Sequence, residues 1–161
     1  MAIKRILIPV DFSDDSLNAL AYARDFALAS AAELVVLHVI EPVYYASPTD
    51  LYATSPNLAL LLDEQRKAGK AELERIAADL QKKHHRVRTL LKTGSPAQVI
   101  VDTAKSIKAD LVVVSTHGRT GFAHIVMGSV AEKVVRGAGC PVLTVRRALL
   151  KAGKKSGRKK R

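Results

Sequence analysis

Five short apolar runs, separated by segments of helical length, constrain the fold of this chain more than any other feature. We expect strands at residues 3–10, 33–40, 86–92, 110–115 and 141–145. Helices are expected after Ser13, over 58–83, after Ser95 and from Ser129 to Gly137. The run 110–115 is apolar through its centre, as expected when helices cover both faces of a strand. The order βαβαβαβαβ predicts an α/β fold, a five-stranded parallel sheet with helices on both faces.

Two of these helices carry recognisable start signals. Ser13 has the character of an N-cap, and Asp14 and Asp15 would follow it in the first turn, where carboxylates complement the helix dipole. Ser95 is expected to cap the third helix, with Pro96 at its first position. Both signals place a helix directly after a strand and a short turn.

The basic character of the chain is concentrated at one end. Of its 26 Lys and Arg, nine lie in residues 146–161, which contain no acidic residue. The other residues of the chain therefore contain 17 basic and 15 acidic side chains. We therefore predict one domain over residues 1–146 and a basic, disordered tail over 147–161. The tail is interpreted as a solubilising end; the alternative is salt-sensitive, sequence-independent attachment to nucleic acid, since it has no aromatic residue for base stacking.

The cysteine content and the hydropathy of the chain indicate the cellular compartment in which we expect it. Cys140 is the single cysteine, which excludes an internal disulfide, and we interpret it as a buried, inert thiol. No apolar stretch approaches the ~20 residues of a membrane span, and no N-terminal signal pattern is present. These features predict a cytoplasmic protein that does not enter a membrane.

Residues 115–129 have the composition of a phosphate-binding loop. Gly118 and Gly121 follow the fourth strand, and Gly128-Ser129 opens the next helix, whose first N–H groups have no partners within the helix. Such N–H groups can hold an anion. The alternative is structural: Ser129 to Glu132 reads as a capping box in which Ser129 starts the helix, and the glycines make turns.

A second polar strand end follows the first strand, at Asp11. In an open parallel sheet, ligands bind beyond the carboxyl ends of the strands where the strand order reverses. If the first and fourth strands are neighbours there, Asp11 and the 115–121 loop face one crevice. The Asp11 carboxylate would then accept hydrogen bonds from ribose hydroxyls or an adenine amine. Alternatively, it bonds the N–H of Ser13 in an Asx turn.

Several common catalytic classes are excluded. The chain contains no Gly-x-x-x-x-Gly-Lys-[Ser/Thr] loop, no glycine fingerprint after the first strand and no Gly-x-Ser-x-Gly elbow. No catalytic residue or protein-bound metal is predicted. Among the histidines, His38 is interpreted as a core residue and His117 as a potential ligand contact, whereas His84, His85 and His124 are expected at the surface.

The sequence over residues 1–146 resembles the universal stress protein family. The resemblance rests on the opening KRILIPVDFSDDS, the second strand LVVLHVI, the loop STHGRTG and the ending GSVAEKVVRGAGCPVLTV. The nucleotide-binding branch of that family carries Gly-x2-Gly-x9-Gly-[Ser/Thr]. Gly118, nine intervening residues and Gly128-Ser129 fit its latter part, and Ser115 replaces its first glycine. The resemblance implies a Rossmann-like sheet of the adenine nucleotide alpha hydrolase type, with strand order 3-2-1-4-5.

The same resemblance implies a function and a site. Bound ATP or AMP, with Mg²⁺ or Mn²⁺ as an accompanying ion, would contact Pro9, Asp11, Val39, Val114, Ser115, Gly118, Gly128, Ser129 and Val130. It also implies a homodimer paired through Val142–Val145, acting as a nucleotide-dependent regulator in a stress response rather than as an enzyme, with at most slow or partner-dependent ATP hydrolysis. The alternative is a dimeric interaction module that binds no nucleotide.

Overall fold

A single parallel sheet forms the centre of the computed structural model, which describes residues 2–42, 56–83, 86–117 and 127–146. Its strands are β1 (Arg5–Pro9), β2 (Glu33–Ile40), β3 (Val87–Thr93), β4 (Leu111–Ser115) and β5 (Val142–Val145). The helices are α1 (Asp14–Ser30), α2 (Pro56–Gln81), α3 (Pro96–Ser106) and α4 (Ser129–Gly137). The observed strand order β3-β2-β1-β4-β5 confirms the predicted topology, including the adjacency of β1 and β4.

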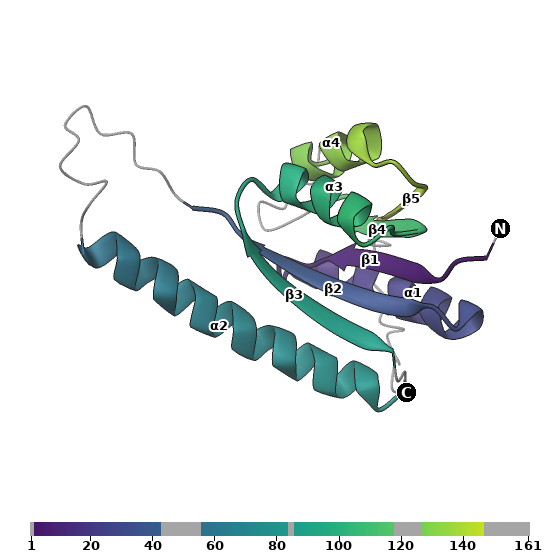
Figure 1. Ribbon diagram of the computed structural model, residues 1–161, viewed down its shortest axis with the longest axis horizontal. Coiled ribbons are helices and arrows are strands. Elements are labelled where there is room, and N and C mark those ends of the chain that lie inside the picture. The colour runs from purple at the N-terminus through teal and green to yellow at the C-terminus, as the bar shows by residue number, and fades with distance from the viewer. Residues whose placement is uncertain (1, 43–55, 84–85, 118–126, 147–161) are drawn as a thin grey trace, which may run out of the picture.

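Helices cover both faces of the sheet, as predicted (Figure 1). Helices α1 and α2 pack on one face, where Ile6, Ile8 and Leu34 meet buried residues of both helices. Helices α3 and α4 pack on the other face against Leu7, Val35 and other aliphatic side chains. The alternation of strand residues between the two cores explains why β1, β2 and β4 are almost continuously apolar.

The predicted helix starts are confirmed with one difference. Ser13 is the N-cap of α1, and its Oγ accepts the N–H of Ser16 at 3.3 Å. Ser95 precedes α3 with Pro96 at the first position, but its side chain makes no capping hydrogen bond. Proline at the first helical position has φ preset for a helix and lacks an N–H group that would need an acceptor, which favours a helix start at this position.

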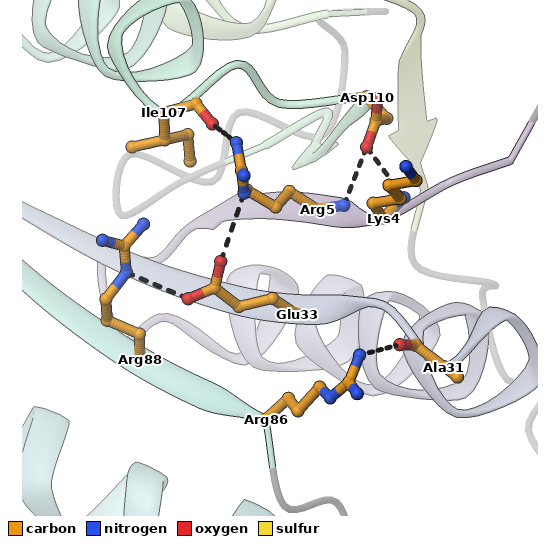
Figure 2. Close-up of polar contacts among 8 residues, drawn as sticks. All are labelled: Lys4, Arg5, Ala31, Glu33, Arg86, Arg88, Ile107 and Asp110. Atoms are coloured by element: carbon orange, nitrogen blue, oxygen red, sulfur yellow. Dashed lines mark hydrogen bonds and ion pairs between the residues drawn. The ribbon is translucent and has the colours of Figure 1, made fainter.

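Charged side chains at the amino ends of the strands tie the elements together (Figure 2). Glu33 of β2 pairs with Arg5 of β1 at 3.5 Å and with Arg88 of β3 at 3.3 Å. The guanidinium of Arg5 also donates to the carbonyl of Ile107 at the end of α3, and Arg86 donates to the carbonyl of Ala31 at the end of α1. Cations placed at helix C-termini satisfy carbonyls that lack intrahelical donors.

Asp110 holds the start of β4 against β1 at the same end of the sheet. One carboxylate oxygen, Oδ2, accepts the backbone N–H groups of Lys4 and Arg5, each at 2.8 Å (Figure 2). These two N–H bonds keep the pKa of Asp110 below its ordinary value. The contacts at the amino ends of the strands therefore stabilise the fold, and a ligand site is to be sought at the carboxyl ends.

Candidate functional site

A cavity of about 1030 Å³ opens at the carboxyl ends of β1, β2 and β4. The strand order reverses between β1 and β4, which is where ligands bind in folds of this class. Eight of the nine predicted nucleotide contacts line this cavity: Pro9, Asp11, Val39, Val114, Ser115, Gly128, Ser129 and Val130. The ninth, Gly118, lies outside the described residues, as does Gly121.

The turn after β1 positions Asp11 at the cavity wall. The Oδ1 atom of Asp11 accepts the N–H of Ser13 at 3.0 Å and its hydroxyl at 2.5 Å, so the Asx turn that we considered as an alternative is present. Asp11 is nevertheless among the residues that line the cavity. One side chain thus shapes the start of α1 and contributes negative charge to the site.

The same turn contains a strained residue. Phe12 has φ of 65°, a left-handed conformation that aromatic residues rarely adopt. Its ring lies 4.2 Å from the ring of His38, and the His38 Nδ1 atom is 2.7 Å from the carbonyl oxygen of Val10. These contacts hold the turn in place. His38 is buried, as expected of a core histidine, and it also borders the cavity.

Two segments of the glycine-containing region meet beside β4. The N–H of Gly128 donates to the carbonyl of Thr116 at 2.7 Å, which brings the start of α4 against the end of β4. A Cβ atom at position 128 would lie 3.3 Å from that carbonyl oxygen, so glycine permits this close approach. The Ser115 hydroxyl turns back within its own segment and donates to the carbonyl of His117 at 2.7 Å.

The amino end of α4 faces the cavity without a side-chain cap. Gly128 is the N-cap, so the capping-box alternative with Ser129 as cap is wrong: Ser129 is the first helical residue. The Glu132 carboxylate pairs instead with Arg136 at 3.1 Å. The first intrahelical bond runs from the Glu132 N–H to Gly128, which leaves the N–H groups of Ser129, Val130 and Ala131 without an acceptor inside the helix.

Helix α2 forms a cavity wall that sequence reasoning missed. Its contributions, at helical spacing, are Gln65, Ala68, Gly69 and Glu72, and further lining comes from Glu41, Pro42, Pro96 and Ile100. Gly69 allows the helix to approach His38, because a Cβ atom there would lie 3.1 Å from the imidazole Cδ2. The i, i+3, i+4, i+7 pattern marks one helix face, but nothing in it shows that the face borders a cavity.

The described lining of the cavity is acidic. Asp11, Glu41 and Glu72 are among the residues that line it, and neither lysine nor arginine is among the described lining residues, although the Glu72 carboxylate pairs with Arg75. A hydrogen bond from Arg75 lowers the pKa of Glu72, so this carboxylate is ionised at neutral pH. Within residues 2–42, 56–83, 86–117 and 127–146, no group of three or more His, Cys, Asp or Glu side chains could hold a metal ion.

The remaining sequence expectations concern Cys140, the other histidines and membrane-spanning helices. Cys140 is partly buried, and burial raises the pKa of its thiol, which agrees with an unreactive side chain. His117 lines the cavity, whereas His84, His85 and His124 lie outside the described residues. None of the described helices is long and apolar enough to cross a membrane.

Comparisons with known proteins agree with this architecture. The model of the universal stress protein family matches residues 2–146. A universal stress protein of Methanocaldococcus jannaschii is 34% identical over 144 residues, which cover 89% of this chain and 82% of the relative.

Solved structures of such proteins share the fold. That of a universal stress protein from Lactobacillus plantarum has a TM-score of 0.81 and 28% identity, covering 91% of this chain and 99% of that one. A universal stress protein crystallised in complex with cAMP has a TM-score of 0.61 and 28% identity, covering 90% and 98%. The chain therefore belongs to the universal stress protein family.

Proposed function

We propose that this protein binds an adenine nucleotide, ATP or AMP, in the cavity at the carboxyl ends of β1 and β4 and acts as a dimeric, nucleotide-dependent regulator in a stress response. One observation carries the proposal. Residues predicted as nucleotide contacts, spread from Pro9 to Val130 in the sequence, line a single cavity. Its volume of about 1030 Å³ is ample for a nucleotide, because small-molecule pockets measure roughly 300–1,000 Å³.

The two ends of the cavity suit the two ends of a nucleotide. Pro9, Val39 and Val114, which line the cavity, would offer apolar surface for an adenine ring, and the Asp11 carboxylate would accept hydrogen bonds from ribose hydroxyls. The unbonded N–H groups at the start of α4 would hold phosphate, assisted by the positive end of the helix dipole. A universal stress protein 28% identical to this chain was crystallised with cAMP, which supports an adenine-containing ligand.

We propose binding rather than efficient turnover. The carboxylate predicted to contact the ribose is that of Asp11, and its Oδ1 is engaged by Ser13. A carboxylate oxygen that already accepts hydrogen bonds from Ser13 is less available to take a proton from an attacking water molecule. Hydrolysis of ATP would therefore be slow or require a partner protein, with Mg²⁺ or Mn²⁺ entering with the nucleotide.

The homodimer is proposed to form through β5. This strand is an edge of the sheet, with Val142, Leu143 and Thr144 half-buried. Pairing two such edges across a two-fold axis would satisfy their free backbone groups and bury the half-exposed side chains.

Isothermal titration calorimetry with ATP, AMP and cAMP tests the binding proposal, and Gly128→Arg is the informative variant. An arginine there would fill the space in front of the α4 N–H groups, so we expect loss of detectable binding. Gly139→Arg adds the same charge at a surface position where a Cβ meets no atom within 4 Å, and it should bind like the unaltered chain.

The alternative function is an interaction module without a nucleotide. It would be supported if the unaltered protein bound none of the three nucleotides and contained none after purification. Equal binding by Gly128→Arg and by the unaltered protein would place any nucleotide site elsewhere.

A further inference from the structure

A second, smaller hollow lies at the amino ends of β1, β2 and β3, at the opposite end of the sheet from the nucleotide cavity. Its volume is about 400 Å³, and its lining consists of Lys4, Arg5, Glu33, Arg86 and Val87. Three of these five residues are cations and one is an acid (Figure 2). Val87 is the one apolar member, and no aromatic residue is among the described lining residues. The groove therefore presents positive charge and little apolar surface.

The carboxylates of this region are already engaged. Glu33 is shared between two cations, Arg5 at 3.5 Å and Arg88 at 3.3 Å. Asp110 attracts the ammonium group of Lys4, but its Oδ2 atom accepts two backbone N–H groups. Arg86 is exposed and donates to a neutral partner, the carbonyl of Ala31, at 3.2 Å. Neither Lys4 nor Arg86 forms an ion pair with a described carboxylate, so both keep their charge available for a partner.

Further lysines extend this charge along the same end of the sheet. Lys83 lies between α2 and β3, and Lys108 lies between α3 and β4; both are exposed. Lys82 is not counted, because it pairs with Asp79 at 3.4 Å. The strand order β3-β2-β1-β4 places Lys83 and Lys108 on either side of the groove. Three strand spacings of about 4.8 Å separate β3 from β4, so the basic residues extend over about 14 Å.

We propose that this amino-end surface, formed by Lys4, Lys83, Arg86 and Lys108 around the groove, binds the phosphate backbone of duplex nucleic acid. Over about 14 Å of its axis, duplex DNA carries about eight phosphate charges, which is enough to meet all four cations. The groove has no aromatic residue for base stacking, so contacts to phosphate would be independent of sequence. An acidic protein fits less well, because the centre of a protein interface is apolar and the groove offers only Val87.

Two variants of equal net charge separate this role from a general charge effect. The surface variant carries Lys4→Gln, Lys83→Gln and Arg86→Gln. The control variant replaces exposed cations in the middle of α2 and of α4, with Arg66→Gln, Lys70→Gln and Lys133→Gln. Each variant loses three charges from +11 and has a formal charge of +8. Residues 147–161, with eight Lys or Arg, are identical in all chains, so their contribution to binding is common to the comparison.

Fluorescence anisotropy with a short labelled DNA duplex, between about 50 and 200 mM salt, provides the test. Each phosphate contact contributes about 0.9 to the slope of log affinity against log salt, so the slope should be shallower by about 2–3 in the surface variant. We expect its affinity to fall about tenfold at the lowest salt, and that of the control variant by less than about twofold. Lys4→Gln alone, which removes one exposed ammonium group, should make the slope shallower by about 0.9 and covers the case of a folding defect in the triple variant.

Three results would overturn the proposal. The first is a surface variant with the salt slope of the unaltered chain, and the second is an equal loss in the control variant. The third is displacement of the duplex by poly-glutamate at a lower charge concentration than by unlabelled duplex, which would assign the surface to an acidic protein. The amino-end surface and the nucleotide cavity lie at opposite ends of the sheet, so a failure to bind nucleotide in calorimetry would leave the DNA measurement unaffected.

Discussion

Replacing Asp110 tests how the amino ends of the strands are held. Its Oδ2 atom accepts the N–H groups of Lys4 and Arg5, each at 2.8 Å, and joins the start of β4 to the start of β1. Asp110→Ala removes both bonds, whereas Asp110→Asn keeps an acceptor oxygen and removes the charge. The backbone bond from the Asp110 N–H to the Arg5 carbonyl at 2.9 Å involves no side-chain atom and should remain in both variants.

The expected cost follows from the geometry and the exposure. A hydrogen bond to a charged acceptor contributes about 1.5–3 kcal/mol when protected from solvent. Here the Lys4 bond is exposed and the Arg5 bond partly buried, so screening by water lowers the combined value. We expect Asp110→Ala to lower the free energy of unfolding by about 1–2 kcal/mol and Asp110→Asn by roughly half of that. For a chain of this length, the first value corresponds to a fall in Tm of about 2–8 °C.

The pH dependence has a defined sign. The pKa of Asp110 is lowered in the folded protein, mainly by the N–H groups of Lys4 and Arg5. The ionised carboxylate therefore stabilises the fold at pH values above its unfolded pKa of ~3.9, and this contribution is lost as the pH falls through the lower folded pKa. The difference between the unaltered chain and Asp110→Asn should thus be constant from pH 7 to about 5 and shrink at more acidic pH.

Urea unfolding followed by circular dichroism measures these differences, since the chain contains no tryptophan. Asp79→Asn is the matched control: this exposed carboxylate pairs with Lys82 at 3.4 Å, and such a pair contributes little. A stability difference between Asp110→Asn and the unaltered chain that stayed constant down to pH 2.5 would refute the reasoning. An equal effect of Asp79→Asn would do the same.

Two further predictions concern the site and the proposed dimer. Ser115 stands where the family motif has its first glycine, and Ser115→Gly removes the side chain that could crowd the ligand. We expect the affinity for ATP to rise by about three- to tenfold, which corresponds to roughly 0.7–1.4 kcal/mol. Unchanged or weaker binding in calorimetry would show that Ser115 does not crowd the ligand. Thr144→Pro should convert a dimer to a monomer in analytical ultracentrifugation while the circular dichroism spectrum is retained. The carbonyls of Pro141 and Val145 accept hydrogen bonds from β4 and the residue after it, so the backbone N–H and C=O groups of the odd-numbered residues in β5 point toward β4 and the Thr144 N–H faces the open edge. A dimer that persisted in this variant would exclude pairing through β5.

The sequence predicted the elements well because each carries its own local signal. The apolar runs that became β1, β2 and β4 are buried on both faces, and hydrophobicity alone identifies such strands. Ser13 caps α1 because a hydroxyl can accept a nearby helical N–H, a short-range effect. The order of the strands came from the family resemblance, since periodicity gives no information about which strands are neighbours.

The start of α4 shows where local signals mislead. The pattern from Ser129 to Glu132 satisfies the capping-box rule, yet Gly128 occupies the cap. The bond from the Gly128 N–H to the Thr116 carbonyl supplies the reason, because it fixes the entry of the chain into the helix from a residue twelve positions earlier. A tertiary contact of this kind has no signature within the four residues of the pattern.

His38 shows that the division between core and site residues does not hold at the carboxyl ends of these strands. It is buried in β2, as its sequence context predicts, yet its Nδ1 lies 2.7 Å from the carbonyl oxygen of Val10 and its ring packs on Phe12. Those two residues flank Asp11, so the core histidine fixes the turn that presents the carboxylate to the cavity. Gly69 completes the arrangement by letting α2 approach the imidazole. The cavity wall formed by α2, which the sequence did not predict, depends on this contact between Gly69 and His38, two residues that lie 31 positions apart in the sequence.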